Sequence, residues 1–136
     1  QYTFRDILNE KFGIKTTKEI FYKAGEIAGK AFCNNMLDKS LELVPFISQL
    51  QNILLELKIG ILKVEETNLE NMNFTFVIEE DLDCSGLPIS NETTCDYDEG
   101  LLAGILYEYF GFEFLVKEID CWSSGDKVCR FEIKRK

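Results

Sequence analysis

The period of the apolar residues changes three times along this chain, and that alternation constrains the fold more than any other feature of the sequence. A helical period gives way to a two-residue period, returns, and gives way again. The predicted elements are helices at 4–12, 17–38, 45–60 and from Asp96 or Asp98 to Gly111, and strands at 60–66, 73–80, 112–120 and 127–134. The order α-α-α-β-β-α-β-β predicts one α+β domain over residues 1–136, with an antiparallel sheet of two hairpins and helices covering one face.

Local signals fix the first two helices. Gly13 ends the first helix, and the pattern Thr16-x-x-Glu19 is a capping box that predicts the start of the second. Gly25 and Gly29 form a small-residue notch on the second helix, where another backbone can approach closely. Both a dimer contact and close packing within the chain use such a notch.

Composition excludes several classes of function. The chain has 136 residues and a net charge of −9, and residues 64–116 contain thirteen acidic residues and no basic one, so we expect no nucleic-acid binding. No apolar run approaches the ~20 residues of a membrane span. Histidine is absent, which excludes Ser-His-Asp and Cys-His catalysis and histidine-liganded zinc.

The cysteine content points to a reducing compartment. Five cysteines, an odd number, occur with no visible signal peptide, so we expect a cytoplasmic protein. The chain opens on Gln1, and we expect further residues upstream of it.

Three cysteines and one glutamate form a candidate metal site. Cys121 and Cys129 are equidistant from Gly125, so the last hairpin should place them opposite each other at its mouth. Cys95 precedes the last helix and Glu118 precedes Cys121, which gives four anionic ligands. Three thiolates and a carboxylate suit tetrahedral Zn²⁺ in a structural site without an open position.

Two interpretations compete with zinc: buried structural thiols, and redox or disulfide chemistry. Strand geometry also opposes it, because Glu118 and Cys121 have opposite parity and would face away from each other. A bulge or the onset of the turn would remove this conflict. Cys84, in the loop at 81–95, is the alternative fourth ligand.

The same C-terminal pattern resembles the signature of the 4-vinyl reductase domain family. The resemblance covers about residues 17–134. The matching residues are Glu118-x-x-Cys121, Gly125-Asp126, Cys129-x-Phe131 and, upstream, Phe21 to Gly25, Gly29, Cys84, Cys95 and Gly100 to Gly104.

This resemblance implies a fold shared with ligand-binding domains of nitric-oxide signalling and Golgi transport proteins. Such domains are mixed α+β, commonly dimeric, and enclose an apolar cavity. Relatives include a bacteriochlorophyll-synthesis protein and the sensor domains of phenol-responsive activators, where a Cys, Glu, Cys, Cys zinc site lies beside the ligand pocket. Carried over, that site falls on Cys95, Glu118, Cys121 and Cys129. The chain departs from the phenol sensors in having no histidine to hold a phenolic hydroxyl.

Aromatic residues gather in the half that carries the cysteines. Phe74, Phe76, Phe114 and Trp122 are the expected walls of a ligand pocket, although core packing explains such residues equally well. No G-x-G-x-x-G pattern or phosphate-binding loop supports a nicotinamide or flavin site, so the sequence leans against an enzyme.

The sequence therefore predicts a zinc-stabilised domain that binds a hydrophobic or aromatic small molecule, as a sensor or carrier and as a homodimer. Two alternatives stay open. One is an accessory or reductase-type protein of tetrapyrrole metabolism, and the other is a dimeric interaction module of the transport-complex type.

Overall fold

The computed structural model describes residues 4–79, 91–124 and 126–136, and for 91–95, 121–124 and 126–127 it describes the backbone alone. Its elements, in chain order, are α1 (Phe4–Phe12), α2 (Ile14–Met36), α3 (Leu43–Glu56), β1 (Ile61–Asn68), β2 (Asn73–Glu79), α4 (Asn91–Phe110), β3 (Phe114–Ser124) and β4 (Asp126–Arg135). The predicted order α-α-α-β-β-α-β-β is confirmed.

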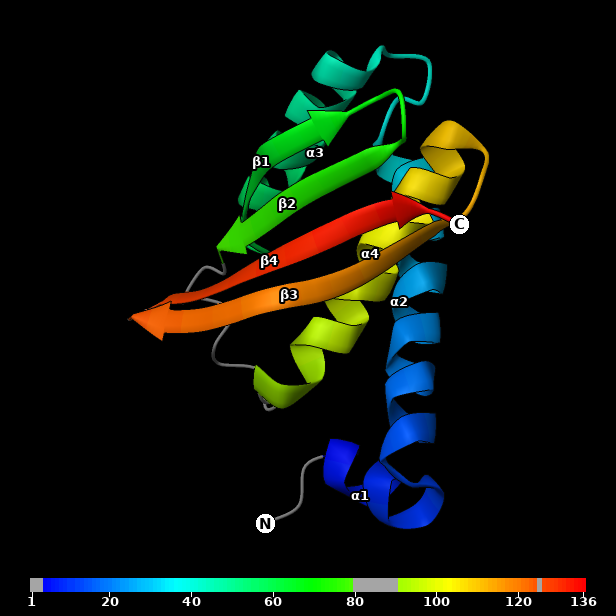
Figure 1. Ribbon diagram of the computed structural model, residues 1–136, viewed down its shortest axis with the longest axis vertical. Coiled ribbons are helices and arrows are strands. Elements are labelled where there is room, and N and C mark those ends of the chain that lie inside the picture. Colours follow the sequence, from blue (N-terminus) through cyan, green and yellow to red (C-terminus); the bar gives the residue numbers. More distant parts are fainter. Residues whose placement is uncertain (1–3, 80–90, 125) are drawn as a thin grey trace.

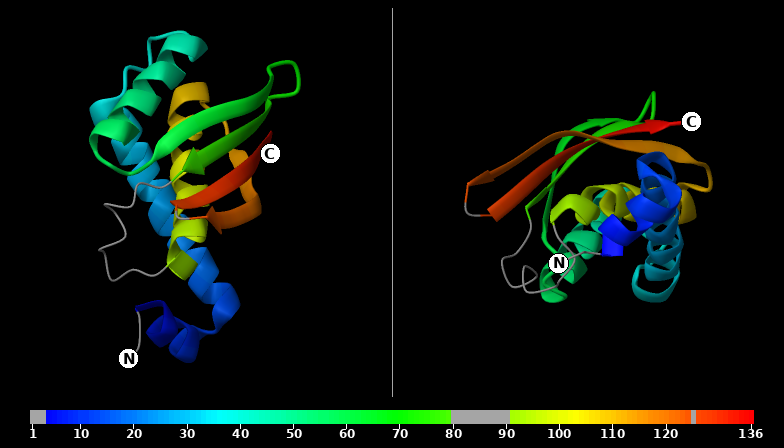
Figure 2. Two further views of the ribbon diagram at one scale, coloured as in Figure 1. Left: turned by 90° about the vertical axis from the view of Figure 1, so that its left-hand side faces the viewer. Right: turned by 90° about the horizontal axis from the view of Figure 1, so that it is seen from below.

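The four strands form one antiparallel sheet in the order β1-β2-β4-β3. Each predicted hairpin contributes two neighbouring strands, and β2 joins the hairpins by pairing with β4. The helices lie on one face of the sheet, with α4 directly behind it and α2 alongside α4 (Figures 1 and 2). The sheet places β1 and β3 at its two edges.

The inner face of the sheet and the facing helices bury a single apolar cluster. Alternate residues of the strands point inward, as the two-residue period predicts. The largest fully buried side chains of the cluster are Phe46, Phe76, Phe114, Phe131, Leu50, Leu54, Leu102, Ile105, Leu106 and Ile133. Within the described residues, no helix combines the length and apolar character needed to cross a membrane.

The backbones of α2 and α4 touch through glycines from both helices. A Cβ atom on Gly29 would collide with the carbonyl oxygen of Leu101, and one on Gly100 would collide with the carbonyl oxygen of Tyr22. Gly25 and Gly104 meet the opposite backbone in the same way. The notch therefore serves close packing within the chain, and a bulky residue at position 29 would test folding and not dimerisation.

Two helix starts differ from the sequence expectation. The second helix begins at Ile14, because Gly13 turns the chain with φ 85° and the Thr17 hydroxyl donates to the Gly13 carbonyl at 2.9 Å. No capping box forms at Thr16, which lies inside the helix. The last helix begins at Asn91, so Asp96 lies within it and does not cap it.

We expect Gly29→Ala to lower the free energy of unfolding by about 2 kcal/mol, although alanine is the better helix former. The added methyl group would force two backbones apart, and neither can move without shifting a whole helix. Urea denaturation measures the change. Ala24→Leu, on the exposed side of α2, is the matched control and should change stability little. Equal or higher stability of Gly29→Ala would contradict this account of the contact.

Candidate functional site

The mouth of the last hairpin brings two cysteines into register. Cys121 of β3 pairs with Cys129 of β4, as the equal spacing from Gly125 predicts. The side chain of Cys129 is 1% exposed. The strand pair thus places residue 121 directly opposite a buried thiol, and directly opposed residues of an antiparallel pair share a face of the sheet.

A β-bulge in β3 removes the parity conflict between Glu118 and Cys121. The register shifts between Glu118, which pairs with Phe131, and Asp120, which pairs with Arg130. Ile119 is the extra residue of the bulge. Positions 118 and 121 consequently both pair with buried residues of β4.

The carboxylate of Glu118 is the clearest sign of a ligand site. Its Oε2 atom is buried and has no hydrogen-bond partner among the described residues. Its backbone N–H donates to Oε2 of Glu99 at 2.7 Å. A buried carboxylate oxygen without a partner is costly, and a bound cation would compensate for that cost.

The surroundings of Glu118 are buried and acidic. Burial raises the pKa of Glu99, and the negative charges of Asp96 and Glu118 raise it further. Burial, helped by the nearby carboxylates of Glu26 and Glu99, raises the pKa of the Tyr22 hydroxyl to about 12. Excess negative charge in a desolvated corner favours a cation over an anion.

A buried ion pair fixes the same part of α4 from the other side. Arg5 of α1 contacts Asp96 at 2.6 Å, and the Arg5 side chain is only 8% exposed. The Arg5 guanidinium also lies 5.3 Å from the centre of the Phe21 ring. Sequence analysis missed this contact, because an arginine on a short amphipathic helix is typical of a solvated face.

The structure describes the side chains of two of the four predicted zinc ligands, Glu118 and Cys129. The backbone of Cys95 lies in α4 and that of Cys121 in β3, but their side chains, and Cys84 altogether, lie outside the described residues. Among the side chains that are described, no three His, Cys, Asp or Glu residues form a group able to hold a metal ion. The residues that are placed fit a cation through the unpartnered Glu118 oxygen, and the full ligand set stays a prediction.

Three of the predicted pocket residues belong to a buried aromatic cluster. The rings of Phe74, Phe76 and Phe114 contact one another or share Phe74, and Phe110 of α4 lies 5.9 Å from Phe74 and 5.4 Å from Phe114. Trp122 lies outside the described side chains. Packing explains these contacts, and their role as pocket walls stays a prediction.

Sequence analysis did not single out Phe46, which extends the aromatic cluster. Its ring stacks on Tyr109 with centroids 4.0 Å apart, and the Tyr109 hydroxyl donates to the Leu41 carbonyl at 2.7 Å. Phe46 is fully buried on α3, directly after the Pro45 that was used only to place the helix start. The apolar period of that helix contained the signal.

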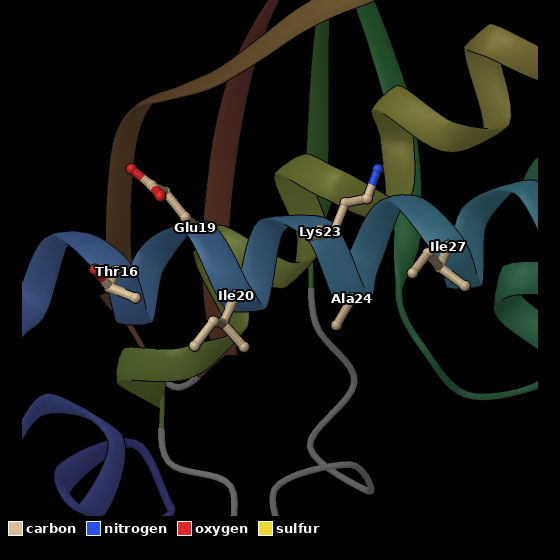
Figure 3. Close-up of a pocket in the computed structure, with 6 residues that line it drawn as sticks. All are labelled: Thr16, Glu19, Ile20, Lys23, Ala24 and Ile27. Atoms are coloured by element: carbon tan, nitrogen blue, oxygen red, sulfur yellow. The ribbon is translucent and has the colours of Figure 1, made fainter. Parts of the chain in front are cut away.

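A shallow hollow of about 400 Å³ lies on the outer side of α2 (Figure 3). It is lined by Thr16, Glu19, Ile20, Lys23, Ala24 and Ile27. All of these residues come from one helix, and Ile20, Ala24 and Ile27 point to the same side. None of the predicted pocket residues lines it.

The arrangement of helices and sheet is that of known small-molecule-binding and transport domains. The phenol-responsive sensory domain of the transcription activator PoxR, solved with phenol, is similar at a TM-score of 0.69 and 15% identity, over 96% of this chain and 70% of that one. A trafficking protein particle complex subunit 3 from Naegleria fowleri, covalently bound to palmitic acid, is similar at a TM-score of 0.64 and 12% identity, over 96% and 86%. H-NOX proteins share the fold as well.

Residues 74–135 match the model of the 4-vinyl reductase domain, and the chain therefore belongs to that family, as its C-terminal signature predicts. A vinyl-4-reductase family protein from Methanocaldococcus jannaschii has a similar structure, with a TM-score of 0.60 and 27% identity over 85% of this chain and 68% of that one. An uncharacterised protein of the same organism is 31% identical over 98 residues, which are 72% of this chain and 58% of the relative. The chain thus spans about three-fifths of the length of that relative.

Proposed function

We propose that this chain is a zinc-stabilised domain that binds a hydrophobic or aromatic small molecule, as a sensor or a carrier. The observation that carries the proposal is the buried, unpartnered Oε2 atom of Glu118, at a bulge that matches its position to the Cys121–Cys129 pair. The family match and the fold of a phenol-responsive sensory domain support the ligand-binding part.

Cys95, Glu118, Cys121 and Cys129 are the residues that would hold the zinc. When bound, zinc would act as a structural cross-link without an open position for catalysis. The chain's own part is to bring the first turns of α4 to the bulged strand and to bury the site. Thiolate ligands require reducing conditions, which supports a cytoplasmic location.

The aromatic cluster is the proposed ligand site. Rings in edge and stacked contacts can open to admit one more ring at little cost, because the incoming ring makes contacts similar to those that it displaces. The chain contains no histidine, and the Tyr109 hydroxyl already donates to the Leu41 carbonyl. We therefore infer that the site selects ligands by shape and apolar contact.

An exposed apolar strip favours a second candidate, the dimeric interaction module. Ile20 and Ile27 are exposed on the outer side of α2, and Phe4, Phe12 and Ile14 are exposed around its start. A second copy of the chain would bury this strip. This homodimer and the ligand-binding function are compatible.

The proposed zinc site predicts that Cys129→Ala abolishes metal binding. Elemental analysis of protein purified without chelator should give about one zinc per wild-type chain and none for the variant. The melting temperature of the variant should equal that of wild-type protein treated with chelator.

The matched control is Cys33→Ala. Cys33 and Cys129 are both fully buried, so both variants lose a similar packing contact, but Cys33 lies on α2 and is not a proposed ligand. The Cys33 variant should keep its zinc. Equal zinc content in all three proteins would refute the assignment.

The proposed ligand site predicts that phenol or palmitate stabilises the protein. A ligand at 100 times its dissociation constant adds about 2.7 kcal/mol to the free energy of unfolding, which a thermal shift detects. Phe74→Leu should weaken this shift, whereas Leu55→Ala, on the exposed side of α3, should preserve it. If neither probe shifts the melting temperature, or if Phe74→Leu leaves the shift intact, the cluster is core alone.

A further inference from the structure

Glu99 joins α4 to the edge of the sheet at the bulge. As an edge strand, β3 has backbone N–H groups that no neighbouring strand can accept, and the bulge disrupts its ladder with β4 as well. At this point the Glu118 N–H donates to Oε2 of Glu99 at 2.7 Å, across 19 residues of sequence. A side chain of α4 thus replaces the missing strand partner.

The two halves of Glu118 are treated differently. Its backbone amide is fixed by Glu99, while its Oε2 atom is buried and has no partner among the described residues. A hydrogen bond that holds the backbone of a ligand residue while leaving the ligand atom available is the usual role of a residue behind a metal ligand.

The position of Glu99 on α4 strengthens this assignment. Cys95 and Glu99 are four residues apart, so their positions share one face of the helix. The ion pair between Arg5 and Asp96 anchors the turn between them. One turn of α4 therefore carries a proposed ligand and the residue that holds another one.

We infer that Glu99 is a positioning residue, which orients Glu118 for the metal by fixing the backbone of the bulge. This inference rests on the zinc site of the proposed function. It adds a residue outside the four ligands.

The test compares metal affinity and cobalt spectra of four proteins. Zinc affinity is measured by competition with a chelator, and Co²⁺ replaces zinc for absorption spectroscopy, because its visible bands report ligand geometry. Glu99→Ala removes the hydrogen-bond acceptor and should weaken zinc binding about 10- to 100-fold and alter the cobalt bands. Glu99→Gln keeps an acceptor oxygen and should stay close to wild type in both measurements.

Glu108→Ala is the matched control. Glu108 also lies on α4, but it contacts Lys39 at 3.7 Å. This variant should bind metal as wild type does. Should Glu99→Ala fail to fold, Glu99→Asp keeps the charge but shortens the side chain, and it should show the same loss of affinity.

The outcomes separate the two proposals. If the wild type binds metal and the Glu99 variants bind it equally well with unchanged cobalt bands, the positioning role is wrong and the zinc site stands. If the wild type binds no metal, the zinc site is wrong and the role of Glu99 falls with it.

Discussion

The contact between the backbones of α2 and α4 is the constraint on which the rest of this structure depends. Gly25 and Gly29 meet Gly100 and Gly104 so closely that a methyl group at any of the four positions would strike the opposite backbone. Such proximity holds α4 along the sheet as a rigid element, and α4 then presents Glu99 to the edge of β3. The acidic corner around Glu118 exists because this helix pair cannot shift.

Burial and charge oppose each other in that corner. Desolvation makes isolated carboxylates costly, yet Glu99 and Glu118 both lie there, and one Glu118 oxygen has no partner among the described residues. Arg5 and Lys117 supply positive charge nearby, but Arg5 is engaged with Asp96. A cation at Glu118 would remove the imbalance, and this links the stability of the domain to metal binding.

Much of this could be predicted from the sequence, because it depends on local periodicity and spacing. The element order and the pairing of Cys121 with Cys129 followed from such patterns, as did the family signature. The bulge at Ile119 could not be predicted, since a parity conflict does not say which residue is inserted. The buried pair of Arg5 and Asp96 depends on how two helices 91 residues apart meet, which no spacing records.

X-ray absorption at the zinc edge, on protein purified without added metal or chelator, tests the central claim most directly. It reports the identity and distance of the atoms around the metal, whether or not a ligand is bound in the aromatic cluster. The account predicts three sulfur atoms at about 2.3 Å and one oxygen at about 2.0–2.2 Å. A sample without zinc, or a shell of nitrogen and oxygen alone, would contradict it.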